Sequence, residues 1–160
     1  MPTFLINTIA IVTIILILLF IVRRVRISLL KSWKDVSIKE VIFHKLLLQT
    51  TILFYSERAK LKNDDNSQLF RRMSRYKKKK VRLLLLQERR DLFAALNHVY
   101  LEMEELDDPT LRELILKFKE LQKARRVYNS KVLIYNQTIS VFPTRFLAIK
   151  MELEIKEYFG

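Results

Sequence analysis

The feature that most constrains this chain is an apolar run near its start, residues 3–22, with the sequence TFLINTIAIVTIILILLFIV. Twenty residues in an α-helix rise about 30 Å, the hydrocarbon thickness of a bilayer. No Lys or Arg precedes the run, and no small-residue cleavage site follows it, so it does not resemble a secretory signal. The run therefore predicts a transmembrane anchor over residues 1–22.

Cations follow this anchor at once, at Arg23, Arg24 and Arg26. Because positive charge is retained on the cytoplasmic side of a membrane, this flank predicts the orientation. We expect a single-pass protein of the cell membrane, with its N-terminus outside and the domain after the anchor in the cytoplasm.

The composition excludes several kinds of site. The chain has one glycine, three prolines and no cysteine, which disfavours a multi-stranded β-fold and excludes disulfides, thiolate metal sites and a cysteine nucleophile. The only glycine is Gly160, so no glycine-rich phosphate loop exists. His98 and Glu102 share a helix face, but no zinc motif accompanies them, so we expect a surface pair. We expect no enzyme, and no catalytic, cofactor or metal site.

Apolar residues recur at alternating steps of three and four along the rest of the chain, which predicts an all-α fold. We expect long helices from the anchor to about Leu61, over 68–106 and over 109–141, then a short helix over 144–150. Residues 23–150 would form an antiparallel bundle of long helices. Residues 151–160 would form an extended tail across it.

Each predicted apolar stripe contains one charged residue: Lys45, Arg89 or Arg125. The three stripes are Ile38, Val41, Lys45, Leu48, Ile52, Tyr55 and Ala59; Val81, Leu85, Arg89, Leu92, Leu96, Val99, Met103 and Leu106; and Leu111, Leu114, Phe118, Leu121, Arg125, Tyr128, Val132, Tyr135, Ile139 and Phe142. One interpretation is a polar layer or cation site inside the bundle. We prefer positions at the stripe edges with solvated heads, because burying three like charges costs several kcal/mol each.

An aromatic residue followed by a partner recurs every seven residues, at Tyr128-Asn129, Tyr135-Asn136 and Phe142-Pro143. In one interpretation the rings pack in the helix seam and the amides bond across helices to fix the register. In the other, the asparagines and Arg126 present a polar face to a partner. Seven-residue spacing is what helix packing requires, so we prefer the first.

The segment from Ala124-Arg125-Arg126 through Tyr128-Asn129, Tyr135-Asn136 and Phe142-Pro143 to Phe146-Leu147-Ala148 resembles the C-terminal signature of the LemA family. Trp33, with Asp35 and Val36, is similar to that family's Trp-containing stretch after the anchor, and Glu157-Tyr158-Phe159 is similar to its aromatic terminus. The chain departs from the family over 43–49, where it has no proline. The resemblance implies a single-pass bacterial membrane protein with a cytoplasmic bundle of long helices and no established catalysis.

Residues 71–82, RRMSRYKKKKVR, carry eight cations and no acid, in a chain of net charge +13. These cations form a candidate patch for an anionic ligand: Arg71, Arg72, Arg75, Lys77, Lys78, Lys79, Lys80 and Arg82. The ligand could be phospholipid, nucleic acid or an acidic protein, and a solvated helix face is the simplest alternative. A straight first helix would place this patch about 55 to 60 Å from the membrane.

These patterns favour a membrane-anchored helical scaffold or protein-interaction module. Its expected partners are the bilayer and an unidentified membrane or cytoplasmic protein, and self-association is compatible with the exposed helix faces. The alternative is an electrostatic binder of anionic phospholipid or nucleic acid through residues 71–82. We do not expect nucleic acid, because no recognition motif is present. If a partner-binding end exists, we place it at Phe142-Pro143, at the end of the bundle far from the membrane.

Overall fold

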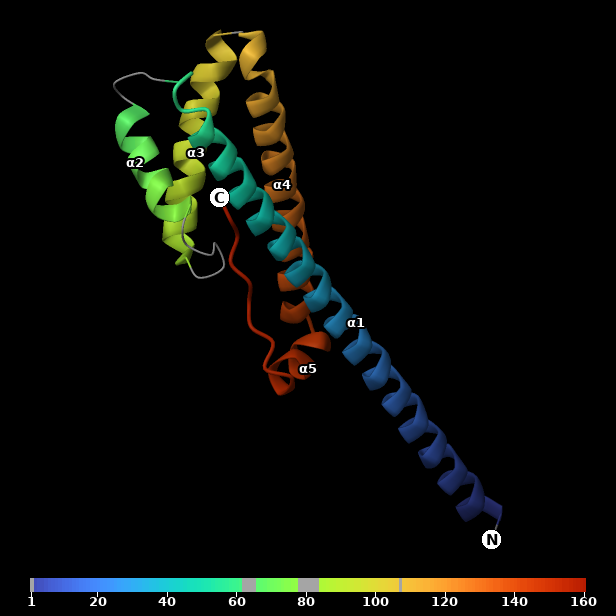
Figure 1. Cartoon of the computed structure of the whole chain (residues 1–160). Helices are drawn as coiled ribbons and strands as arrows, with labels where there is room; N and C mark the ends of the chain where they lie inside the picture. Colours follow the sequence, from blue (N-terminus) through green and yellow to red (C-terminus); the bar gives the residue numbers. More distant parts are fainter. Residues whose placement is uncertain (1, 62–65, 78–83, 107) are drawn as a thin grey trace. The chain divides into compact units, whose positions relative to one another are not determined.

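The computed structural model describes residues 2–61, 66–77, 84–106 and 108–160. Its helices are α1 (Pro2–Ser56), α2 (Asn66–Lys77), α3 (Leu86–Leu106), the short 3-10 helix η2 (Pro109–Leu111), α4 (Arg112–Ser140) and α5 (Thr144–Lys150), as Figure 1 shows. No strand occurs in the described ranges. The predicted all-α class is confirmed.

The chain divides into two compact units. Unit 1 comprises residues 1–36 and 131–157, and unit 2 comprises residues 37–130 and 158–160. The helices α1 and α4 each contribute residues to both units.

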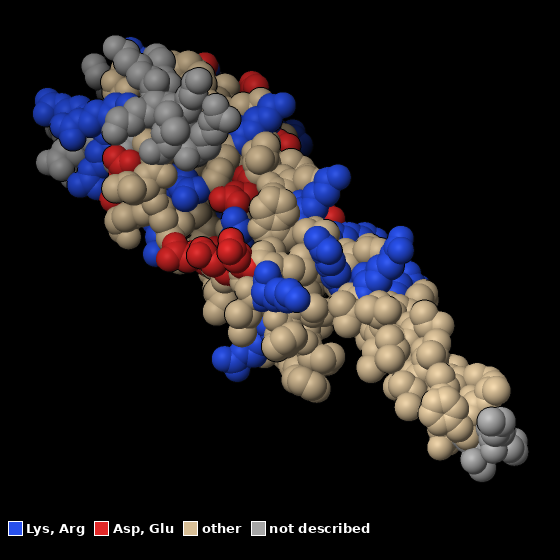
Figure 2. Space-filling view, turned by 90° about the horizontal axis from the view of Figure 1, so that it is seen from below, with Lys and Arg blue, Asp and Glu red and all other residues tan. Residues whose placement is uncertain are grey.

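In unit 1, the start of α1 is long enough and apolar enough to cross a membrane. Its most apolar window has a mean hydropathy of 3.0, and none of that window is buried in the protein. In Figure 2 this segment is tan on the face shown, and blue side chains begin where the apolar run ends. Judged by length and hydropathy, no other helix among the described residues could cross a membrane.

In unit 2, α1 and α4 run antiparallel. The ring centroids of Phe43 and Tyr128 lie 6.0 Å apart, and those of Phe54 and Phe118 lie 6.1 Å apart, so rising numbers on α1 meet falling numbers on α4. The same direction holds in unit 1, where Lys131 Nζ lies 3.5 Å from Asp35 Oδ2 and where Val22 and Phe142 line one groove.

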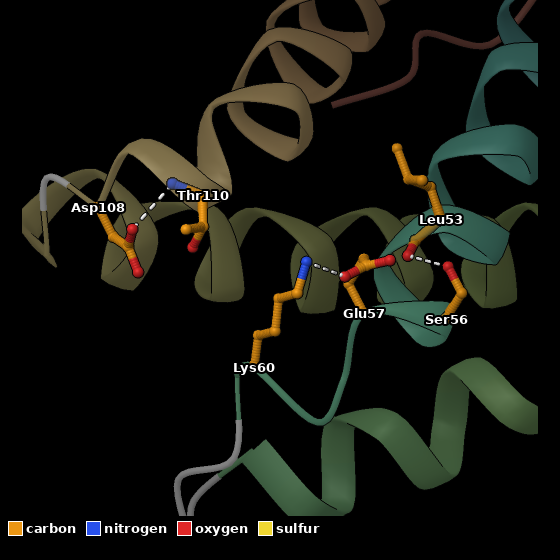
Figure 3. A network of polar contacts seen from close by, with 6 residues as sticks. All are labelled: Leu53, Ser56, Glu57, Lys60, Asp108 and Thr110. Carbon is orange, nitrogen blue, oxygen red and sulfur yellow. Dashed lines mark hydrogen bonds and ion pairs between the residues drawn. The ribbon is translucent and has the colours of Figure 1, made fainter.

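Local polar contacts end α1 and begin η2, and Figure 3 shows both. The Ser56 hydroxyl donates to the Leu53 carbonyl at 2.7 Å, and Lys60 Nζ lies 2.6 Å from Glu57 Oε2. Asp108 Oδ1 accepts from the Thr110 backbone N–H at 2.8 Å, which caps the next helical segment ahead of Pro109. The predicted start at 107–109 is thus confirmed at Asp108, whereas α1 ends five residues before the predicted Leu61.

The predicted buried stripe on the first helix is wrong. Val41 is 67% exposed, and Ile38 and Ile52 are also exposed, whereas the residues that pack inward are Leu29, Val36, Phe43, Leu47, Thr50, Thr51 and Phe54. Apolar residues lie on both faces of α1 here, so periodicity alone allows two stripes. The face that carries the two phenylalanines is buried, because large rings remove more apolar surface from water.

The predicted single helix over 68–106 is also wrong. Helix is absent at Leu84 and Leu85, and α3 begins at Leu86. The Glu88 carboxylate accepts from the Leu85 backbone N–H at 3.0 Å, half of a capping box that favours a helix start at this point. α2 then packs against α3 in unit 2, as Figure 1 shows. This additional helix reverses the direction of every later helix relative to the prediction.

The predictions for the last two helices are confirmed. The helix expected over 109–141 is η2 followed by α4, and the short helix expected over 144–150 is α5. All the apolar members of the α4 stripe from Leu111 to Ile139 are buried, and Phe118, Leu121, Val132 and Tyr135 have no exposed surface. Phe142 is the exception, being 85% exposed.

Candidate functional sites

Two asparagines of α4 hold the C-terminal tail by its backbone. In unit 2, Asn129 Nδ2 donates to the Phe159 carbonyl at 2.7 Å, and the Phe159 N–H donates to Asn129 Oδ1 at 2.8 Å. In unit 1, Asn136 makes the same pair of bonds with Lys156, at 2.8 and 2.9 Å. Also in unit 1, the Tyr135 hydroxyl donates to the Glu154 carbonyl at 2.9 Å. We use the name tail clamp for these tail-binding side chains, each within its own unit: Asn129 in unit 2, and Tyr135 and Asn136 in unit 1.

The asparagine amides of the tail clamp make the hydrogen bonds that a neighbouring β-strand would make to the tail backbone. A side-chain amide offers one donor and one acceptor side by side, so it satisfies both backbone groups of an extended residue. Seven helical residues rise about 10.5 Å, and three extended residues span about 10 Å, so asparagines seven apart match tail residues three apart. This spacing accounts for the asparagines of the repeat, and their seven-residue separation is the part of the signal that the sequence contains.

The structure bears out one part of the first interpretation of the repeat, the packing of the rings, and corrects the part about the amides. The Tyr128 and Tyr135 rings are buried, as expected for packing in the seam. The amides bond to the tail rather than across helices, and Arg126 is exposed. The tail contributes Phe159, which is 2% exposed, with its ring centroid 4.6 Å from that of Phe43 and 5.8 Å from that of Phe93. The repeat therefore links helix packing to docking of the tail.

The three charged residues of the predicted stripes do not form one layer. Lys45 is exposed. The Arg125 guanidinium lies over the Phe93 ring, 4.6 Å from its centroid. Arg89 is half-buried, and its guanidinium donates to His44 Nε2 while lying 3.9 Å from Glu40 Oε1. Arg89 and Arg125 thus have partners that the sequence pattern did not indicate.

His44 is held in its neutral form by this arrangement. Burial is the main cause, and the positive charge of Arg89 adds to it, so the pKa of His44 falls to about 4 from 6.5, with Glu40 opposing. The pKa of His44 in the folded protein lies below its pKa in the unfolded chain. The free energy of unfolding therefore has its full value above about pH 6.5, where His44 is neutral in both states, and it decreases as the pH falls toward 4, because only the unfolded chain takes up the proton.

We expect the protein to lose about 1–2 kcal/mol of stability through His44 between pH 7 and pH 4, a figure that allows for its partial exposure. His44→Gln keeps an acceptor for Arg89 but cannot be protonated, so its unfolding free energy should fall less over this range. Urea unfolding of the full chain in mild detergent, followed by circular dichroism at both pH values, compares the two proteins. Equal losses in both would contradict the assignment.

A basic groove lies between the end of α1 and α2 in unit 2. It has a volume of about 440 Å³ and is lined by Tyr55, Arg58, Phe70, Arg71, Ser74 and Arg75. We call it the arginine groove. Buried Phe70 and Met73 fix α2 to the core, so Arg71 and Arg75, one turn apart, share a face that stays accessible.

The arginine groove is suited to an anion. The guanidinium carbon of Arg58 lies 4.4 Å from the centroid of the Tyr55 ring, and Arg58 also donates to the Tyr55 carbonyl at 2.9 Å, which orients it. Among the residues that the structure describes, no acidic side chain lines the groove. Guanidinium groups bind phosphate oxygens in pairs of parallel hydrogen bonds, so three of them around one hollow favour a phosphate group. The sequence interpretation included Arg71 and Arg75 but missed Arg58, because Arg58 lies beyond the loop, outside the basic run.

Among the described side chains of the predicted patch, Arg72 does not line this groove. Arg72 is exposed on α2, and Lys77 is the last residue of that helix. Lys78, Lys79, Lys80 and Arg82 lie outside the described residues, as does Val81 of the predicted stripe. Trp33, on α1 in unit 1, is 42% exposed.

The prediction that Phe142-Pro143 lies far from the anchor is wrong. Both residues line a groove in unit 1 together with Ile21, Val22 and Val25, at the end of the apolar run of α1. The extra helix described above is the cause, since it makes α4 run back toward the anchor.

The titratable residues offer no obvious metal centre. Within the described ranges, no group of three or more His, Asp or Glu side chains could hold a metal ion. His98 Nδ1 and Glu102 Oε1 lie 3.2 Å apart on the helix surface, as the prediction of a surface pair requires.

No family model matches the chain, and no curated protein or solved structure is similar to it.

Proposed function

We propose that this protein is a membrane-anchored helical interaction module of the LemA type. Residues 1–22 would be a single-pass anchor, residues 23–150 an antiparallel cytoplasmic bundle and residues 151–160 its tail. The observation that carries the proposal is the length of α1. Its apolar, unburied start is long enough to span a bilayer, and the same helix continues without interruption into a part that packs against other helices. The LemA resemblance supports the same architecture through residues 124–148.

In this proposal the bundle acts by presenting surfaces to partners rather than by catalysis. The exposed cations at Arg23, Arg24 and Arg26 support a cytoplasmic bundle. A membrane or cytoplasmic protein would bind a bundle face, and a second copy of the chain could do so as well.

The absence of cysteine makes the orientation directly testable. A cysteine inserted after Met1 should react with a membrane-impermeant maleimide added to intact cells, whereas Gln137→Cys, exposed on α4, should react only after the membrane is opened. Crosslinking in the same membranes, followed by pull-down, should recover a reproducible partner or a dimer. Reversed labelling would overturn the orientation, and a monomer without any partner would argue against the interaction module.

A second candidate function is binding of an anionic ligand, which the arginine groove specifically favours. Arg58, Arg71 and Arg75 surround a hollow that no carboxylate lines within the described ranges. The ligand chemistry would be a phosphate group, carried by a phospholipid headgroup or by nucleic acid, and bound without base specificity.

A further inference from the structure

The helix α5 in unit 1 turns an apolar face to solvent. Ala148 is 2% exposed and Leu147 is half-buried, so these two residues attach the helix to the rest of unit 1. Phe146 and Ile149 point outward and are 70% and 68% exposed. At about 100° per residue, Arg145 and Lys150 fall on either side of this outward pair.

Phe142, two residues before α5, extends the same apolar character, since it is 85% exposed. We call Phe142, Phe146 and Ile149 the membrane foot. Three large apolar side chains this exposed, flanked by cations and without any acid over residues 141–151, are typical of helices that lie in a membrane interface.

The position of α5 relative to the anchor sets the depth at which the membrane foot would meet lipid. A groove of about 370 Å³ separates α5 from α1, and its walls include Ile21, Val22 and Val25 on one side and Phe146 and Leu147 on the other. Val22 is the last apolar residue before Arg23 and Arg24, whose exposed side chains belong at the headgroup level. Figure 1 shows α5 beside α1.

We propose that the membrane foot inserts into the boundary between the headgroups and acyl chains of the leaflet that the anchor leaves. This inference rests on the proposed anchor, because α5 reaches lipid only if residues 1–22 span the bilayer. The apolar surface of the foot is then continuous with that of the anchor. Arg145 and Lys150 contact the headgroups, which favours anionic phospholipid. Unit 1 thereby gains a second membrane attachment, and its angle to the membrane is restricted.

Tryptophan fluorescence in vesicles with bromine on the upper acyl chains tests this insertion, because bromine quenches only a nearby indole. The chain has one tryptophan, so Trp33→Phe supplies a silent full-length background. Phe146→Trp reports the membrane foot, Phe20→Trp reports the anchor, and Leu116→Trp, 59% exposed near the other end of α4, is the control. The vesicles contain phosphatidylcholine and phosphatidylglycerol.

We expect bromine to lower the emission of the Phe20→Trp and Phe146→Trp proteins at least about twofold and to leave that of Leu116→Trp unchanged. Quenching of Phe20→Trp alone, with Phe146→Trp behaving as the control, overturns the membrane foot and leaves the anchor intact. Unquenched Phe20→Trp overturns both.

Two further measurements separate lipid from protein as the occupant. In lipid discs that hold one copy of the chain, quenching of Phe146→Trp should persist. Blue-shifted, unquenched emission in vesicles that shifts to the red in these one-copy discs would assign the face to a second copy. Adding Arg145→Gln and Lys150→Gln should weaken the quenching in vesicles with phosphatidylglycerol more than in vesicles of phosphatidylcholine alone. An equal response in the two lipids would refute the role of anionic headgroups.

Discussion

Replacing both Asn129 and Asn136 with Ala is expected to lower the free energy of unfolding by about 4 kcal/mol, since four hydrogen bonds of about 1 kcal/mol each are lost. The double variant leaves the N–H and carbonyl of Phe159 and Lys156 without their amide partners. Phe159 is held in the aromatic core partly by these bonds, so its ring should leave the neighbourhood of Phe43.

Urea unfolding of the full chain in mild detergent measures this loss, and hydrogen exchange locates it. Exchange of the Lys156 and Phe159 amides should accelerate strongly, while amides in the middle of α3 should change little. Gln137→Ala removes an exposed amide from the same helix and should cost less than about 0.5 kcal/mol. If the double variant is as stable as this control and its tail amides stay protected, the clamp does not hold the tail.

Charge reversal in the arginine groove is expected to reduce the affinity for a phosphate-bearing ligand at least about 30-fold. Arg71→Glu with Arg75→Glu removes two guanidinium contacts, each worth about 1.5–3 kcal/mol, and places repelling carboxylates in the hollow. The fold should tolerate both changes, because the two side chains are exposed while Phe70 and Met73 keep α2 attached.

Arg72→Glu is the matched control, since Arg72 is exposed on the same helix but does not line the groove. The full chain in phosphatidylcholine discs is titrated with a soluble inositol polyphosphate and, separately, with a short single-stranded oligonucleotide. A selective loss in the double variant identifies the groove. Equal losses in the double variant and the control would show diffuse electrostatic attraction, and no loss in either would remove the second candidate function.

The buried face of a helix could be predicted from the sequence only where one face is clearly more apolar than the others. On α4 one series with steps of three and four runs without a break from Leu111 to Ile139, and every apolar member of that stripe is buried, although Leu116, Leu133 and Ile134 outside it are exposed. On α1, Ile38 and Val41 on one face competed with Phe43 and Leu47 on another, and only packing selected between them. Periodicity identifies a helix reliably, whereas choosing its buried face requires its neighbours.

Candidate sites depended still more on the tertiary structure. The arginine groove needs Arg58, which is separated from Arg71 by a loop, and the His44–Arg89 contact joins residues 45 positions apart. The asparagines of the tail clamp were partly predictable, because the rise of seven helical residues equals the length of about three extended residues. Its partner nevertheless had to be recognised as backbone, which carries no side-chain signature in the sequence.

The sequence by itself determined the helical class, the anchor-like run and the buried stripe of α4, because each depends on the local order of apolar and polar residues. Only the tertiary structure decided the direction of α4 and, with it, the position of Phe142-Pro143 beside the end of the apolar run. The physical reason is the helix break at Leu84–Leu85, where an additional reversal changes the path of the chain while leaving the apolar periodicity almost unaltered.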